Sequence, residues 1–359
     1  MVERNRSLTF LALCAVAALG GGAWLWTGCA QASKKSPAAR EAAQAQQQQQ
    51  PQPATVRPRR ATENSNAAPP TAPVREETGP MNQSEANRER GGAQPEGPVS
   101  FYTALERALA ARGASREQVC DPGDPVSRRI LEDYGAMFVA SSEVRPPSRC
   151  IFDDEAEVLA FQQEAKSAAA TIAGVRVELQ PAAMRALLEA REEARARGLD
   201  ITPRGGSEAA RRNYTDTRRL WDSRFLPALT YWKGRGRLSA EQVASLRRSP
   251  LREQVREVLE LEKRGIFFSK DLSKSILYSV AAPGSSQHLS MLAFDALQFG
   301  DARVRSILAR HGWFQTVKSD LPHFTYLGVE EGELPARGLR RVEASGHVFW
   351  IPNINRAEG

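Results

Sequence analysis

Two histidines and an aspartate in the C-terminal third of the chain have side-chain types that suit a metal site. His288 and Asp295 are near neighbours in sequence, and His323 follows the turn at Leu321-Pro322. Zinc accepts both imidazole and carboxylate ligands, at about 2.0–2.2 Å. If His288 lies in a tight loop or starts a strand, and Asp295 ends the next segment, the two side chains converge. Three protein ligands leave a fourth position for water, as in catalytic zinc sites.

The segment that contains these residues resembles the zinc D-alanyl-D-alanine carboxypeptidase and dipeptidase family, which acts on cell-wall peptides. Its motif is S-x-H-x-x-G-x-A-x-D followed by Glu-x-x-His, and the matching residues are Ser286, His288, Ala293 and Asp295, then Asp320-Leu321-Pro322-His323. The resemblance spans residues 175–330 and is strongest from Pro283 to Leu327. It implies that His288, Asp295 and His323 bind Zn²⁺.

Two departures from the family motif concern the backbone and the general base. Met291 replaces the usual glycine, so the chain lacks glycine's conformational freedom there. Asp320 replaces the glutamate that serves as general base in the family. An aspartate is also a proton acceptor, but its shorter side chain needs a closer backbone, and a misplacement of about 1 Å can cost roughly a hundredfold in rate.

The resemblance also implies an upstream arginine that stabilises charge on the substrate or in the transition state. Arg204, in Ile201-Thr202-Pro203-Arg204-Gly205-Gly206-Ser207, loosely matches the family's S-G-x-R-S element. A planar guanidinium suits an oxyanion or a terminal carboxylate. Arg211 and Arg212 are nearby alternatives, and Arg204 could equally be a surface residue in a polar loop.

The histidines also have structural interpretations. His311 follows a predicted helix, where a cation is favoured, and His347 alternates with apolar residues on a predicted strand. His311 is predicted to be structural, and His347 is predicted to be a sheet residue or a contact at the rim of the site. The alternative to metal binding is that His288 and His323 are hydrogen-bonded histidines of the protein core.

The secondary-structure elements that must position these residues are predicted to be a mixture of helices and short strands. Helices are expected at 101–112, 126–134, 153–170, 181–197, 207–232, 239–263 and 302–310, and strands at 136–140, 175–179 and 201–202. Short strands are expected beyond Pro283. This pattern favours an α+β fold, in which a small antiparallel sheet is flanked by helices, with a helical N-terminal extension over 99–174 and a D,D-peptidase-like domain over 175–359.

Residues 1–32 are predicted to be an export segment. Arg4 and Arg6 precede an uncharged apolar run. Three fates are open: a lipid on Cys29 in a lipobox-like sequence, cleavage after Ala30-Gln31-Ala32, or an uncleaved span that anchors the chain in the membrane. The expected location is the periplasm or cell envelope.

Residues 33–98 are predicted to be a disordered linker. They contain an uninterrupted glutamine run at 46–50 and many prolines, a composition that cannot bury enough apolar surface to fold. The formal net charge is +7, but charged residues of both signs are interspersed and only 7% of the chain is aromatic. A nucleic-acid partner is therefore not expected.

Two cysteines, Cys120 and Cys150, lie in the part of the chain that is expected to fold. An oxidising periplasm favours a disulfide between them, and two buried thiols are the alternative.

The sequence therefore predicts an exported zinc peptidase that hydrolyses the D-amino-acid-containing stem peptides of peptidoglycan. A protein of another class is the main alternative: a non-catalytic peptidoglycan-binding or scaffolding protein that retains the fold. A zinc peptidase with an unrelated protein substrate is a third.

Overall fold

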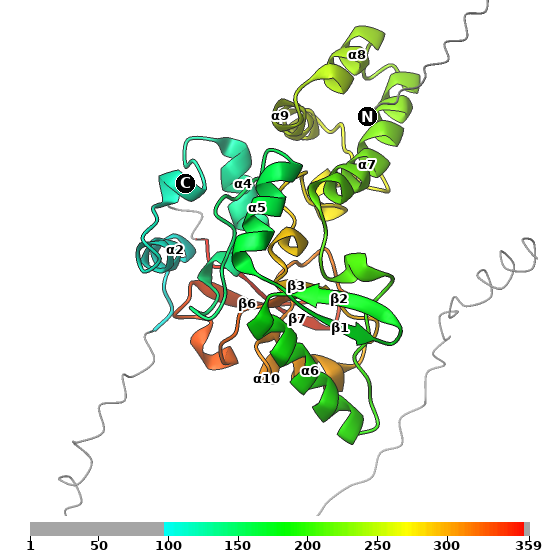
Figure 1. Ribbon diagram of the computed structural model, residues 1–359. Coiled ribbons are helices and arrows are strands. Elements are labelled where there is room, and N and C mark those ends of the chain that lie inside the picture. Colours follow the sequence, from blue (N-terminus) through cyan, green and yellow to red (C-terminus); the bar gives the residue numbers. More distant parts are fainter. Residues whose placement is uncertain (1–96, 355–359) are drawn as a thin grey trace, which may run out of the picture. The chain divides into compact units, whose positions relative to one another are not determined.

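The computed structural model describes residues 97–354, which form helices and small antiparallel sheets of the predicted α+β class (Figure 1). The predicted export segment and its three fates, and almost all of the predicted linker, lie outside the described residues. Within the described range, no helix is both long and apolar enough to cross a membrane.

Most helices begin where a side chain can accept hydrogen bonds from the first turn. The helices are α2 (Phe101–Ala110), α3 (Arg116–Val119), α4 (Pro125–Tyr134), α5 (Glu155–Ala165), α6 (Pro181–Ala196), α7 (Tyr214–Gly234), α8 (Ala240–Arg248), α9 (Leu251–Lys263) and α10 (Ala302–Arg310). The N-caps of this kind are Ser100, Ser115, Asp124, Asp154, Asn213, Ser239 and Asp301. Such caps satisfy backbone N–H groups that have no partner inside the helix. The helix expected over 302–310 is confirmed.

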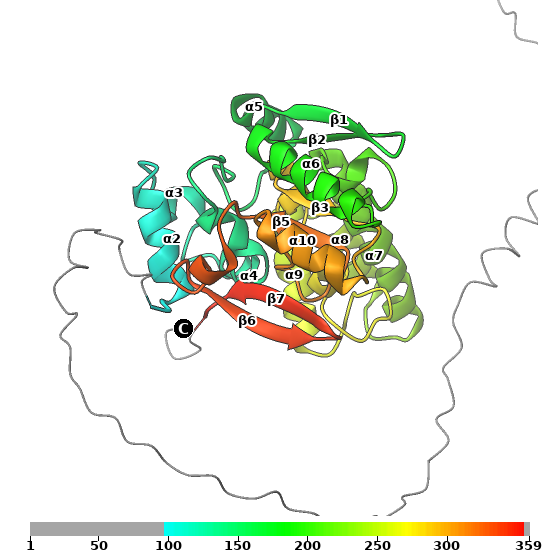
Figure 2. The same ribbon diagram turned by 90° about the horizontal axis from the view of Figure 1, so that it is seen from below.

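The strands form three separate antiparallel sheets. β1 (Ala168–Ile172) pairs with β2 (Val175–Leu179), β6 (Leu339–Ala344) pairs with β7 (His347–Pro352), and the central sheet has the order β3 (Ala293–Asp295), β5 (His323–Tyr326), β4 (Trp313–Phe314). Short 3₁₀ helices connect these elements: η1 (Gly135–Val139), η2 (Ser207–Ala209), η3 (Ile276–Tyr278), η4 (Gln287–Ser290) and η5 (Glu331–Glu333). In Figure 2, α6 lies between the β1–β2 hairpin and α10.

The helix predicted over 153–170 ends early. α5 stops at Ala165, and residues 168–172 form β1 instead. The two-residue turn Ala173-Gly174 has positive φ at both positions, 49° and 80°, which is the geometry of a tight hairpin. Pairing with β2 therefore outweighs the helix propensity of the alanines in this stretch.

The strand predicted over 136–140 is wrong, because this apolar run forms η1. Its carbonyl groups accept hydrogen bonds from two arginine side chains rather than from a neighbouring strand: Arg112 donates to Phe138 and Ala140, and Arg337 donates to Val139. A short run that is buried on all sides does not reveal its period in the sequence. Residues 201–202 likewise form no strand, and an isolated bridge joins Pro203 to Ala296.

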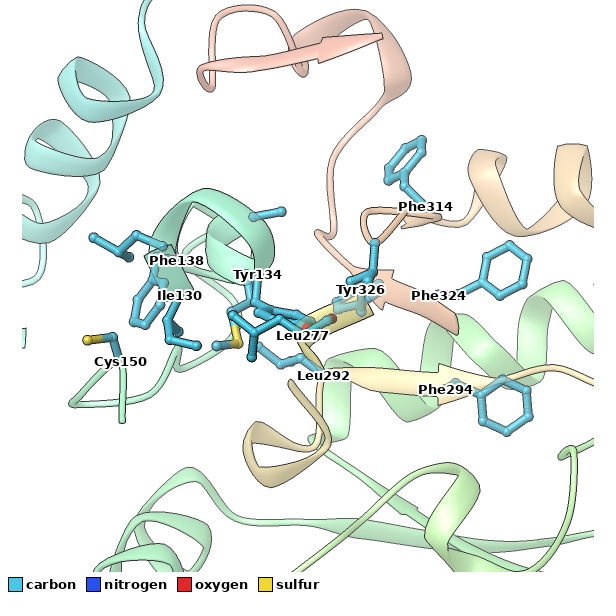
Figure 3. Close-up of a cluster of buried hydrophobic side chains, with 14 of the residues drawn as sticks. Ile130, Tyr134, Phe138, Cys150, Leu277, Leu292, Phe294, Phe314, Phe324 and Tyr326 are labelled. Carbon is cyan, nitrogen blue, oxygen red and sulfur yellow. The ribbon is translucent and has the colours of Figure 1, made fainter. Parts of the chain in front are cut away.

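One hydrophobic core joins both predicted folded regions. Figure 3 shows Tyr134 and Phe138, from α4 and η1, near Leu277, Leu292 and Tyr326, which come from the second region. The predicted boundary between 174 and 175 falls in the turn of the β1–β2 hairpin. Residues 99–174 are therefore packed into the same core as the residues that follow them.

The structure joins Cys120 and Cys150 in the disulfide that the sequence favours. Both cysteines are buried, and the backbone N–H of Cys150 donates to the Val119 carbonyl. The bridge closes a loop between residues 30 apart in sequence.

Replacing both cysteines with serine is expected to lower the free energy of unfolding by about 3–4 kcal/mol, because the unfolded chain regains the entropy of a loop of this length. Urea denaturation of the variant and the wild type measures the difference. Reduced wild type should match the variant, and a denaturation midpoint that is insensitive to reductant would contradict the expectation.

Candidate metal centre

The central sheet brings two of the predicted ligands together. Asp295 ends β3 and His323 begins β5, and the two residues are directly opposite each other in the antiparallel register. Side chains at such positions lie on one face of the sheet with their Cβ atoms about 4.5–5.5 Å apart. His288 approaches from the 3₁₀ helix η4.

A backbone carbonyl sets the tautomer of His288. Its Nδ1 lies 2.8 Å from the oxygen of Ala210, and a carbonyl oxygen only accepts hydrogen bonds. Nδ1 therefore carries the ring proton, and Nε2 presents its lone pair to the interior. The ring is 1% exposed, so it keeps this orientation.

A buried glutamine sets the tautomer of His323. Gln287 Nε2 donates to the carbonyl of Tyr134 at 2.8 Å, which leaves Gln287 Oε1 as the acceptor. That oxygen accepts from Thr325 Oγ1 at 2.5 Å and lies 2.7 Å from His323 Nε2. Nε2 of His323 therefore carries the proton, and Nδ1 presents its lone pair inward.

Three lone-pair atoms consequently face one another. His288 Nε2 lies 3.1 Å from His323 Nδ1 and 3.3 Å from Asp295 Oδ1, and His323 Nδ1 lies 3.2 Å from the same oxygen. Ligand atoms around a tetrahedral zinc with bonds of about 2.0–2.1 Å are about 3.3–3.4 Å apart. The triangle already has the size of one face of such a tetrahedron, so this buried group could hold a metal ion.

The charges of the site favour a cation over a proton. Burial, followed by repulsion from Arg212, lowers the pKa of His288 to about 4. Burial opposes ionisation of Asp295, but the neighbouring histidines hold its pKa well below the usual value. Asp295 is therefore an ionised carboxylate at neutral pH. Metal ions bind to that state, since they compete with protons for these atoms.

An arginine orients the carboxylate from outside the triangle. Arg212 Nη2 donates to Asp295 Oδ2 at 2.8 Å, and Arg212 Nε donates to the carbonyl of Glu208. The second oxygen of the carboxylate is thereby left for the interior. Such outer partners fix the geometry of metal ligands.

A cavity of about 80 Å³ adjoins the two histidines and is also lined by Asp320 and Arg212. It has room for several water molecules. No hydrogen bond or ion pair engages the Asp320 carboxylate within residues 97–354. Desolvation raises its pKa, and Asp295 raises it further, whereas His323 and the two arginines, Arg212 and Arg204, lower it. Asp320 is thus a carboxylate with unused acceptor capacity beside the candidate metal position.

The side chain of Arg204 lies outside the group formed by His288, Asp295 and His323. Its side chain is exposed, with the guanidinium carbon 5.6 Å from the centre of the Phe299 ring. Its backbone N–H donates to the Asp295 carbonyl at 2.8 Å. The side chain that contacts the site is that of Arg212, which the sequence offered as an alternative.

The other two histidines have partners outside the metal group. His311 caps the end of α10 and lies 2.8 Å from Glu193, and His347 Nδ1 lies 3.0 Å from Gln315 Oε1. Their predicted structural roles agree with these contacts.

Met291 has the backbone conformation that glycine adopts most easily. Its φ is 57° and its ψ is 29°, at the end of η4. A left-handed conformation costs a residue with a Cβ atom about 1–2 kcal/mol. The Met291 side chain is fully buried, and burial of a methionine contributes about 1.5–3 kcal/mol. Burial of the side chain therefore offsets the backbone strain, and this position does not require a glycine.

Sequence reasoning did not identify Gln287 or the carbonyl of Ala210 as part of the site. Gln287 precedes His288 directly, but a glutamine beside a histidine is no signal by itself. Its role depends on contacts with Tyr134 and Thr325, which are distant in sequence.

Comparisons with family models, curated proteins and solved structures gave no match to this chain.

Replacing either His288 or His323 with alanine is expected to abolish binding of one zinc ion per chain, because two ligands do not hold the ion tightly in competition with water. Metal analysis after dialysis measures the content. His311→Ala is the matched control and should retain the metal. Zinc retained in the His288 or His323 variants would show that the ion binds elsewhere.

Gln287→Leu is expected to weaken zinc affinity by about 10–100-fold, the usual effect of losing an outer partner of a ligating histidine. Competition with a chelating dye measures the affinity. Gln315→Leu removes the equivalent partner from His347 and should leave zinc affinity unchanged. Equal affinity in the two variants would contradict the role assigned to Gln287.

Proposed function

We propose that the protein is an exported zinc hydrolase that cleaves a peptide bond in the D-amino-acid-containing stem peptides of peptidoglycan. The observation that carries the proposal is the triangle of inward lone pairs on His288, Asp295 and His323, with separations of 3.1–3.3 Å. Zinc suits two nitrogens and one oxygen and leaves a fourth position open.

The surroundings of the triangle support hydrolysis. Zinc in such a site supplies Lewis acidity, which polarises a carbonyl group and lowers the pKa of water. Asp320 lines the adjacent cavity and has no competing partner in the described part of the chain, so its carboxylate is free to accept a proton from water. The resulting carboxylic acid could then donate its proton to the leaving amine.

The arginines have separate roles in this proposal. Arg212 holds Asp295 in its ligating orientation through the 2.8 Å contact. Arg204 is exposed, yet close enough to lower the pKa of Asp320. Its guanidinium is available to stabilise a developing oxyanion or to bind a substrate carboxylate.

The sequence supports the substrate class and the compartment. The ordered His288, Asp295 and Asp320-x-x-His323 pattern resembles the zinc D,D-peptidases, and the first residues resemble an export signal. The Cys120–Cys150 disulfide suits an oxidising compartment such as the periplasm.

Asp320→Asn is expected to lower the turnover of purified muropeptides by about 10²–10⁴-fold and to leave zinc content unchanged, because the amide cannot accept the proton. Chromatography of the digest measures turnover. Asp222→Asn, on α7 and away from the cavity, is the control. Full turnover in Asp320→Asn would exclude Asp320 as the base. Muropeptide binding by the wild type with no turnover would favour the non-catalytic wall-binding protein.

A further inference from the structure

A groove of about 720 Å³ adjoins the metal cavity and is lined mostly by residues outside the 175–330 segment of the family resemblance. It lies against α3 and α4, η3, the 316–319 loop and the β6–β7 hairpin. The residues that line both the groove and the metal cavity are Tyr134, Leu277, Tyr278, Val317 and Ser319. The groove and the metal cavity are therefore adjacent, and two of the shared residues, Tyr278 and Ser319, are exposed.

The groove is positively charged. Five cationic side chains line it, against the two carboxylates of Glu132 and Asp133. Asp133 already pairs with Arg129 at 2.6 Å, and Glu132 accepts a hydrogen bond from Tyr102. The acidic groups of the groove are thus engaged by neighbouring side chains.

The other four cations have no acidic partner within residues 97–354. Lys318 and Arg340 are exposed and make no side-chain hydrogen bond or ion pair there, and the Arg128 side chain donates only to the carbonyl of Pro122. Arg116 lies over the Tyr102 ring at 4.2 Å. Cationic groups that line a groove without acidic partners are suited to receive an anionic ligand.

We propose that this groove binds a carboxylate-bearing peptide segment of the substrate, with Lys318, Arg340, Arg128 and Arg116 as recognition residues. The assignment rests on the proposed hydrolase function and deepens it, since it names the residues that bind the part of the substrate distant from the scissile bond. Guanidinium groups match carboxylates in geometry and bind them through paired hydrogen bonds. A groove of this size accommodates a ligand of several residues.

Tyr278 supplies an apolar surface where the two cavities meet. It is 46% exposed, and it lines both the groove and the metal cavity. An aromatic ring at this junction packs against a peptide that passes from one cavity to the other.

A peptide explains the groove better than a nucleic acid or another phosphate polymer. Phosphate polymers are bound by long basic tracts, whereas the free cations here are few and adjoin a candidate peptidase centre. A carboxylate-bearing peptide segment offers a few separate negative charges, which matches a small set of unpaired cations.

The test is the binding of a fluorescein-labelled disaccharide pentapeptide, with free or amidated carboxylates, to the zinc-loaded full chain. Every sample carries Asp320→Asn, so that the probe stays intact. Fluorescence anisotropy gives the dissociation constant. Lys318→Glu with Arg340→Glu is the groove variant. Lys270→Glu with Arg248→Glu changes net charge equally on exposed residues outside the groove and is the control.

The groove variant is expected to weaken binding of the free-carboxylate probe by about tenfold, as the loss of two partly exposed charge contacts predicts. The control variant should bind as the parent does, and amidation of the probe should weaken binding to the parent by a similar factor. Raising the salt concentration should reduce the difference.

Equal binding by the groove and control variants would overturn the groove assignment, and the Asp320→Asn turnover test would still decide the proposed function separately. A short polyphosphate that binds the parent more tightly than either probe, and is lost in the groove variant, would overturn the choice of a carboxylate-bearing peptide.

Discussion

The three side-chain atoms that converge on the candidate metal position are the constraint on which the site depends. His288 Nε2, His323 Nδ1 and Asp295 Oδ1 lie 3.1–3.3 Å from one another, and each side chain is held in its orientation by a separate partner. The partners are a backbone carbonyl, an amide oxygen and a guanidinium. A cation at the centre would neutralise the carboxylate and bind both imidazoles, and the three side chains would need little rearrangement to receive it.

Much of the site could be predicted from the sequence, because its ligands belong to a short motif with a fixed order. His288, Asp295 and His323 were identified from their types and spacing, and the structure brings them together. The residues that orient the ligands could not be identified in this way. Gln287 and Arg212 act through contacts that depend on how distant segments meet, and no local pattern encodes those contacts.

The fold was predictable where local signals and tertiary packing agree. The helix over 302–310 has a capping aspartate and an amphipathic pattern, and it forms as expected. Residues 168–172 have helix-forming alanines, yet the Ala173-Gly174 turn pairs them with β2. The apolar run 136–140 is buried on every side, so its sequence carries no periodicity that would separate a strand from a 3₁₀ turn.

The hydrogen bond from Gln287 to the Tyr134 carbonyl makes the candidate centre inseparable from the residues before it. Tyr134 belongs to α4, which precedes the whole sequence resemblance, yet its carbonyl orients the glutamine that orients His323. The C-terminal part is consequently not a transferable module. A fusion protein or a grafted domain that begins at residue 175 would carry all three ligands and lack the group that fixes one of them. The order of the motif residues in the sequence and the portability of the domain are therefore separate matters in this chain.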